Sequence, residues 1–204
     1  MPRILLITDP DHPLGIVESV EQALSEGADQ RVAVQLRAKS RSDQKFLEVA
    51  SLLRVLTSSA NCQLLINSRA DIATLVQADG VHLPEQGLPA LQVRELLGAS
   101  ARIGRSCHDT KSVAQASCEP IDYLTLGPFQ TLPNKAPAMT MGEFSLALRS
   151  STHPVLALGG VSLAEAPLFL EAGAYGMAVI RAVFTSENPA IALQTLLQLI
   201  DKHS

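Results

Sequence analysis

The stretch Asp122-Tyr123-Leu124-Thr125-Leu126-Gly127-Pro128 decides the fold class of this chain. It is a short apolar run that ends in a glycine and a proline, residues that stop a strand and leave bare backbone open to a ligand. Two later stretches have the same design, Leu158-Gly159-Gly160-Val161 and Gly176-Met177-Ala178-Val179-Ile180-Arg181. Because helix-length segments separate the three, they indicate parallel strands whose carboxyl ends converge on one site, the last two at the place where a barrel commonly binds phosphate.

The same alternation extends over the whole chain. Strand-type apolar runs occur at Ile4–Thr8, Val32–Leu36, Gln63–Ile66, Gly80–Leu83, Arg102–Ser106, Tyr123–Leu126, Val155–Leu158 and Gly176–Ile180. Helical spacing occurs at Ile16–Ser25, Asp43–Leu56, Ala70–Val76, Leu88–Leu97, Thr110–Ser117, Met141–Arg149, Leu163–Glu171 and Ala190–Lys202. This pattern in 204 residues predicts a (β/α)8 TIM barrel that forms a single domain over residues 1–204, with an open doubly wound sheet as the competing fold.

Capping residues and glycines support the expected helix ends. Start signals stand before three of the helices, at Ser42, at Ser162 with Glu165 three residues later, and at Asn188-Pro189. Stop signals fall at Gly27, Gly98 and Gly173. Residues 131–140 form the long irregular stretch of the chain and follow the sixth strand, so we interpret them as an active-site loop.

Composition narrows the class of protein. Apolar residues make up 47% of the chain and aromatic residues 3%, which predicts a core of small branched side chains. A net charge of −4 with scattered cations argues against nucleic acid as a partner. The apolar runs are too short for a bilayer span, the N-terminus lacks signal-peptide features, and the three cysteines lack metal-ligand spacing. We therefore expect a cytoplasmic protein without a membrane partner, and a homo-oligomer is compatible with the sequence.

Two strand ends carry groups suited to an anion. Strand alternation puts Gln35, Arg37 and Lys39 on one side of the second strand, which offers an amide and two cations to a phosphate or pyrophosphate. A solvated basic strand end explains the same residues equally well. Asn67 ends the third strand and could donate to a ligand or cap the next helix, and Lys135 could clamp a phosphate or be an ordinary surface lysine.

His108 is the best candidate for proton transfer. It lies just past the fifth strand, where an imidazole can reach the mouth of a barrel and act near neutral pH. A helper at the start of the following helix is the competing interpretation. His82 lies between two apolar neighbours, which is more typical of a satisfied core histidine, and Cys107 is expected to be a small buried residue.

The two last strand ends offer backbone rather than side chains. Gly159 and Gly160 lack Cβ atoms and let their N–H groups approach an anion. Val179 and Ile180 precede another turn that could present backbone in the same way. Neither a Walker-type nor a dinucleotide-binding fingerprint occurs, and we expect no metal ligands.

Taken together, these motifs resemble the thiamin phosphate synthase and thiazole tautomerase superfamily. The matching stretches cover almost the whole chain in the same order: Leu5-Leu6-Ile7-Thr8, Gln35-Leu36-Arg37-Ala38-Lys39, Ile66-Asn67-Ser68-Arg69, Gly80-Val81-His82-Leu83, Gly104-Arg105-Ser106-Cys107-His108, Asp122-Tyr123 to Gly127-Pro128, Ala157-Leu158-Gly159-Gly160 and Ala178-Val179-Ile180. The resemblance implies a (β/α)8 barrel that handles a thiazole phosphate and, in the synthase, an aminopyrimidine pyrophosphate with Mg²⁺.

The resemblance also implies roles for the strand-end residues. The pyrophosphate side would consist of Gln35, Arg37, Lys39, Asn67 and Lys135. The thiazole phosphate would be held through the backbone of Gly159, Gly160, Val179 and Ile180.

The chain departs from the synthase pattern at the metal. Synthases usually have a carboxylate at each of two positions, and here these positions are Ser68 and, by simple alignment, Gly87. Neither can replace an anionic oxygen ligand for a hard dication, although Glu85 could partly substitute. Arg181 stands where a serine is usual.

These departures favour a metal-independent thiazole tautomerase-like protein that acts on a thiazole or carboxythiazole phosphate. His108 aligns with the histidine that serves as acid and base in that branch. No cofactor is then expected. The alternatives are a thiamin phosphate synthase with altered Mg²⁺ ligands and a non-catalytic binder of a thiamin-pathway phosphate such as thiazole phosphate or thiamin phosphate.

Overall fold

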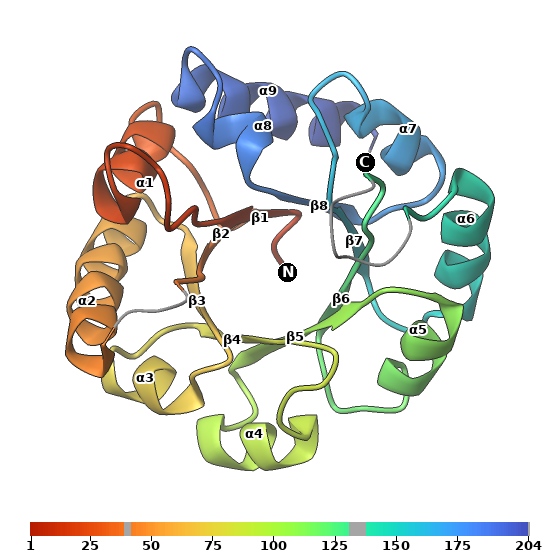
Figure 1. Ribbon diagram of the computed structural model, residues 1–204, viewed down its shortest axis with the longest axis horizontal. Helices are drawn as coiled ribbons and strands as arrows, with labels where there is room; N and C mark the ends of the chain where they lie inside the picture. Colours follow the sequence, from red (N-terminus) through yellow and green to blue (C-terminus); the bar gives the residue numbers. More distant parts are fainter. Residues whose placement is uncertain (39–41, 131–137, 204) are drawn as a thin grey trace.

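A closed barrel of eight parallel strands forms the centre of the computed structural model, which describes residues 1–38, 42–130 and 138–203 (Figure 1). Each strand pairs with its neighbours in chain order, and the first strand pairs with the last. The strands are β1 Ile4–Ile7, β2 Val32–Leu36, β3 Gln63–Asn67, β4 Gly80–Leu83, β5 Arg102–Cys107, β6 Tyr123–Leu126, β7 Val155–Leu158 and β8 Gly176–Val179. The predicted (β/α)8 barrel is confirmed, and the open doubly wound sheet is excluded.

Helices surround the barrel and cover its outer face (Figure 1). They are α1 Ile16–Leu24, α2 Asp43–Ser59, α3 Ala70–Leu75, α4 Ala90–Leu97, α5 Thr110–Ala116, α6 Met141–Ser150, α7 Ala166–Glu171, α8 Arg181–Phe184 and α9 Pro189–Lys202. The sequence analysis missed α8, a single helical turn directly after the last strand. A segment this short has no apolar periodicity to read.

The side-chain caps explain where the helices begin. Ser42 accepts a hydrogen bond from the backbone of Lys45, and Asn188 accepts one from the backbone of Ile191. Ser162 and Glu165 bond each other as expected, but they close a turn, so α7 begins at Ala166 rather than at Leu163. Glycines with positive φ end the segments at the predicted positions, Gly27, Gly98 and Gly173.

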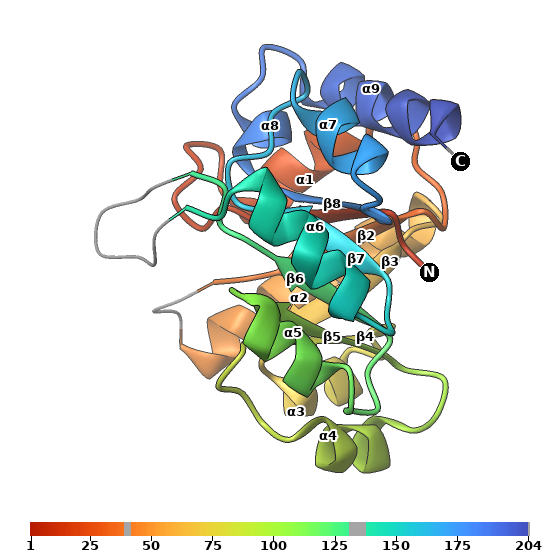
Figure 2. The same cartoon turned by 90° about the vertical axis from the view of Figure 1, so that its right-hand side faces the viewer.

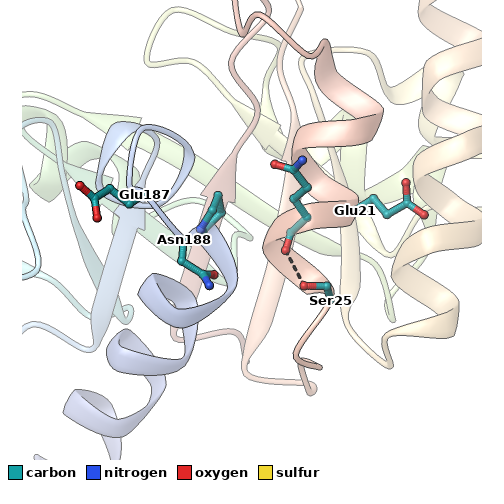
Figure 3. Close-up of a pocket in the computed structure, with 6 residues that line it drawn as sticks. Glu21, Ser25, Glu187 and Asn188 are labelled. Carbon is teal, nitrogen blue, oxygen red and sulfur yellow. Dashed lines mark hydrogen bonds between the residues drawn. The ribbon is translucent and has the colours of Figure 1, made fainter.

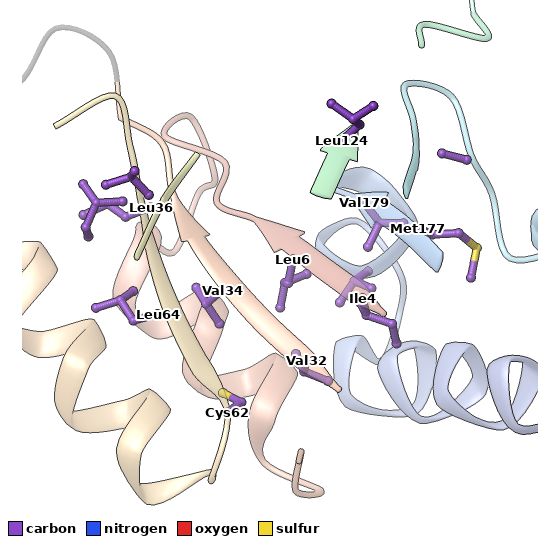
Figure 4. Packing of buried hydrophobic residues seen from close by; sticks show 14 of the residues in the cluster. Ile4, Leu6, Val32, Val34, Leu36, Cys62, Leu64, Leu124, Met177 and Val179 are labelled. Carbon is purple, nitrogen blue, oxygen red and sulfur yellow. The ribbon is translucent and has the colours of Figure 1, made fainter. Parts of the chain in front are cut away.

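The larger hydrophobic core lies between the strands and the helices. Ile4 and Leu6 of β1 and Val32 and Val34 of β2 are fully buried there, and Figure 4 shows them beside residues of the neighbouring strands. The alternation within each strand sends the residues between them into the barrel instead. The barrel thus separates two apolar layers.

The smaller core fills the interior of the barrel. It contains Leu5, Ile7, Ala33, Leu65, Tyr123, Leu156 and Ala178. Met1 packs against this cluster, and both the N-terminal residues and the end of α9 lie at the same end of the barrel (Figure 2). The interior is therefore closed at the amino ends of the strands, which leaves the carboxyl ends for a site.

Across the described part of the chain, none of the helices combines the length and the apolar character needed to cross a membrane.

Candidate functional site

The ends of β2 and β3 bring two of the predicted residues together. The Nε2 of Gln35 donates to the Oδ1 of Asn67 over 2.9 Å, and the Nδ2 of Asn67 donates to the Oγ of Ser68 over 2.9 Å. Gln35 is 2% exposed, and its Oε1 has no hydrogen-bond partner among the described residues. Gln35 therefore presents a buried acceptor without a partner, and one of the two N–H groups of its amide is used by Asn67.

Arg37 is fixed by its backbone. Its N–H donates to the Oγ1 of Thr8 over 2.9 Å, and its carbonyl oxygen accepts from the same hydroxyl over 3.1 Å. The end of β1 thus holds the exit of β2 and positions Arg37 at the mouth of the barrel. Lys39 and Lys135, both predicted to bind pyrophosphate, lie outside the described residues, and so does most of the predicted active-site loop.

His108 lies at the ends of β5 and β6. Its Nδ1 is 2.7 Å from the carbonyl oxygen of Gly127, and its backbone N–H donates to the Oγ of Ser112 at the start of α5. A carbonyl oxygen can only accept, so Nδ1 carries the proton in the neutral ring and Nε2 holds the lone pair. The side chain is 46% exposed, so this free nitrogen is accessible from solvent.

Glu85 is a neighbour of His108 that sequence reasoning did not connect with it. The Oε2 of Glu85, in the turn after β4, lies 3.8 Å from the Nε2 of His108. The pairing of β4 with β5 brings the two turns side by side. The strand order alone could have suggested this proximity, but the direction of the Glu85 side chain depends on the conformation of its turn.

A second histidine lies deep in the barrel. The Nδ1 of His82 is 3.0 Å from the hydroxyl of Tyr123, and its Nε2 is 2.9 Å from the Oγ of Ser106. Burial, with a smaller effect of the charge on Arg105, lowers the pKa of His82 to about 3. His82 is therefore a neutral, satisfied histidine of the barrel interior, as the sequence favoured, and Ser106 is a polar residue near the mouth that the sequence analysis did not select.

The glycine turn after β7 has the open backbone that the sequence predicts. Gly159 and Gly160 have φ values of 90° and 94°, in the region that favours glycine. A Cβ on Gly160 would lie 2.7 Å from the Cβ of Gln130, which packs over the turn. Within the described ranges, no hydrogen-bond partner is found for the N–H of Gly160.

The residues after β8 complete this side of the mouth. Val179 is buried at the end of the strand, and Ile180 is the residue directly before α8. Arg181, the first residue of α8, donates from Nη2 to the Oε1 of Gln130 over 3.1 Å. Since β7 lies between β6 and β8, this bond links the ends of the two strands that flank the glycine turn.

The donors near β3 and β4 do not fit a magnesium site built from two carboxylates. Ser68 accepts a hydrogen bond from Asn67, and Gly87 supplies no side chain. A Cβ on Gly87 would lie 2.9 Å from the carbonyl oxygen of Pro84, so an aspartate here would require the turn to shift. In the part of the chain that the structure describes, no three His, Cys, Asp or Glu side chains are grouped to hold a metal ion.

Cys107 precedes His108 but faces the other way. Its side chain is 1% exposed and belongs to the core outside the strands. Burial raises the pKa of its thiol to about 12. It is an inert core residue, as the sequence analysis expected.

A groove on the outside of the barrel is separate from this mouth. It lies between α1 and the start of α9 and is lined by Glu21, Gln22, Ser25, Glu187, Asn188 and Pro189 (Figure 3). None of the predicted site residues lines it. Its two carboxylates repel an anion, so the groove does not suit a phosphate.

Comparison with known proteins identifies the family. Residues 4–183 match the family described as thiamine monophosphate synthase. A relative from Geobacter sulfurreducens called a putative thiamine-phosphate synthase is 39% identical, with 97% of this chain aligned to 93% of that protein. The structure of a thiamine phosphate pyrophosphorylase from Pyrococcus furiosus superposes with a TM-score of 0.87 at 29% identity, covering 98% of this chain and 96% of that one.

Some relatives are longer than this chain. A thiamine-phosphate synthase of Synechococcus sp. (strain CC9605) is 40% identical over 98% of this chain, which corresponds to 56% of that protein. The barrel is thus the whole of some relatives and about half of others. The matched region and the full-length relatives show that this chain belongs to the thiamine monophosphate synthase family, whose members handle phosphate-bearing substrates of the thiamine pathway.

Proposed function

We propose that this chain binds a thiazole phosphate at the mouth of its barrel and moves a proton on the thiazole ring through His108. The fixed tautomer of His108 carries the proposal. With Nδ1–H donating to Gly127, the free Nε2 can accept a proton from the ligand and return it at another ring position. One group suffices for both transfers because the reaction has no net gain or loss of protons.

The glycine turn would anchor the ligand. The N–H of Gly160 suits a phosphate oxygen, and a phosphate held there would place the ring of the ligand toward the centre of the mouth, near His108. Arg37 supplies positive charge on the opposite side of the barrel. Binding of the phosphate holds the thiazole ring next to His108, so that the proton is transferred between groups that are already in position.

Coupling of an aminopyrimidine pyrophosphate with a thiazole phosphate is the second candidate. The names of the relatives favour this reaction, which the sequence analysis held as the alternative, over the tautomerase interpretation that it put first. The open Oε1 of Gln35 also supports it, because a buried acceptor suits an amino group better than a phosphate oxygen.

Magnesium is the difficulty for the second candidate. The family resemblance implies Mg²⁺ held by two carboxylates, and Ser68 and Gly87 do not form such a site. Coupling by this chain would require its cations to neutralise the charge of the departing pyrophosphate.

A product assay separates the candidates. The protein is incubated in D₂O with the carboxythiazole phosphate tautomer, and separately with both coupling substrates and Mg²⁺, and products are followed by NMR and mass spectrometry. Deuterium in an isomerised thiazole supports proton transfer. Thiamin phosphate with released pyrophosphate supports coupling and contradicts the primary proposal. Ligand binding without either product leaves the non-catalytic binder.

A further inference from the structure

The turn between β4 and α4 is held in one conformation by a buried arginine. Arg105 of β5 is 4% exposed, and its guanidinium donates from Nη1 to the carbonyl oxygen of Pro84 and from Nη2 to that of Leu88, each over 3.0 Å. It therefore bonds both ends of the turn that carries Glu85. Glu119 neutralises the buried guanidinium.

The turn is also tight within itself. The N–H of Gly87 donates to the carbonyl oxygen of Pro84 over 2.9 Å, and a side chain at Gly87 would collide with Pro84. With Arg105 binding the outer carbonyls, the backbone next to Glu85 has little freedom. The fold thus sets the point on the backbone from which the Glu85 carboxylate extends.

That carboxylate lies beside the free nitrogen of His108. The 3.8 Å separation between Oε2 and Nε2 is an ion-pair distance once the ring is protonated. Proton abstraction from a ligand creates this imidazolium, and a nearby negative charge stabilises it. Since the Nδ1 side is fixed by Gly127, both nitrogens of the ring have a defined partner.

We propose that Glu85 is the counter-ion of His108 and that Arg105 positions it by clamping the turn. This inference rests on the proposed function, because His108 must become protonated during the reaction. Glu85 and Arg105 act through His108 and are positioning residues.

Other charges near His108 are accounted for. Asp109 caps α5 by accepting from the backbone of Ser112, and Lys111 follows in the first turn of that helix. Arg105 and Glu119 form their own ion pair behind the strand. From β6, the contact with His108 is the neutral carbonyl of Gly127. Among the described residues, Glu85 is the carboxylate within ion-pair distance of the ring.

The first test follows the ring itself in ligand-free protein. The protonation of His108 is followed by ¹H–¹⁵N NMR against pH in the unaltered protein, in Glu85→Gln and in Glu95→Gln, a control on the exposed face of α4. We expect the His108 ring of Glu85→Gln to lose its second proton at a pH about 0.3–0.7 lower, because partly exposed pairs are modest in strength. Identical curves for all three proteins would overturn the inference.

The second test uses turnover of the carboxythiazole phosphate. Glu85→Gln should lower kcat about 3- to 10-fold with KM unchanged, and Glu85→Asp should recover part of the loss. Arg105→Lys should also lower kcat. The double variant with Glu85→Gln should have a kcat only slightly below that of Glu85→Gln alone. Equal kcat in Glu85→Gln and the unaltered protein would contradict the role of Glu85.

The two tests separate this inference from the proposed function. If the unaltered protein does not isomerise the thiazole, the proposed function fails, and the NMR curves still decide whether Glu85 pairs with His108. If isomerisation occurs and the NMR curves coincide, the function stands and the pairing is wrong.

Discussion

The imidazole of His82 and the phenol of Tyr123 are hydrogen-bonded inside the barrel, with 3.0 Å between Nδ1 and the hydroxyl oxygen. The centroids of the two rings lie 5.5 Å apart, and the Tyr123 ring fills the space that Gly104 leaves open on β5. The hydroxyl of Ser106 is hydrogen-bonded to Nε2, the other ring nitrogen of His82. The barrel interior thus contains a neutral histidine with both nitrogens satisfied, and protonating it would put an unpaired charge in the core.

This arrangement predicts a dependence of stability on pH. The pKa of His82 is about 3 in the folded protein because of burial, whereas an unfolded histidine has a pKa near 6.5. Between these values the unfolded chain binds more protons, so the contribution of His82 to stability falls as pH drops below about 6.5. The free energy of unfolding is measured in urea at pH 7 and at pH 5. Its decrease between the two pH values should be about 1–2 kcal/mol smaller in His82→Gln than in the unaltered protein. The same loss in both proteins would contradict a buried neutral His82.

The glycine turn predicts a specific loss of binding. Gly160→Ala places a Cβ against Gln130 at a φ of 94°. We therefore expect thiazole phosphate to bind at least about 10-fold more weakly. The free energy of unfolding should fall by about 1–3 kcal/mol. Gly142→Ala in α6 is the matched control, since its Cβ would make only an ordinary contact with the Oγ1 of Thr140 at 3.9 Å and should stabilise the helix by up to about 1 kcal/mol. Calorimetric titration and urea unfolding measure both. Unchanged affinity in Gly160→Ala would exclude the turn as the phosphate anchor.

The absence of a carboxylate at Ser68 and Gly87 predicts that magnesium has little effect on pyrophosphate binding. With neither residue supplying a carboxylate, Mg²⁺ should change the affinity for pyrophosphate less than about 3-fold in isothermal titration calorimetry. Calcium at the same concentration controls for ionic strength. A strong enhancement specific to Mg²⁺ would show that other residues hold the ion and would move the account toward coupling.

The barrel could be predicted from the sequence because its signals are local. Strand-length apolar runs such as Val155–Leu158 and caps such as Asn188 depend on residues adjacent in the chain. The single turn of α8 carries no such period. The contact of Gln35 with Asn67 follows from the pairing of β2 with β3, so strand order alone brings these two predicted residues together.

The electrostatic partner of His108 could not be predicted in this way. Its distance from Glu85 depends on how Arg105 folds the turn after β4, and that clamp uses backbone carbonyls that carry no sequence signature. The unpartnered acceptor of Gln35 could not be predicted either, because the residue type does not say whether the oxygen or the nitrogen of an amide finds a hydrogen-bond partner.

The central claim is that Nε2 of His108 moves the proton, and the direct measurement is turnover by His108→Ala. The rate of isomerisation of the carboxythiazole phosphate is compared with that of the unaltered protein, and thiazole phosphate binding is measured by calorimetry in both. The account predicts that kcat falls at least about 100-fold while the affinity changes less than about 3-fold. Undiminished turnover in His108→Ala would contradict it.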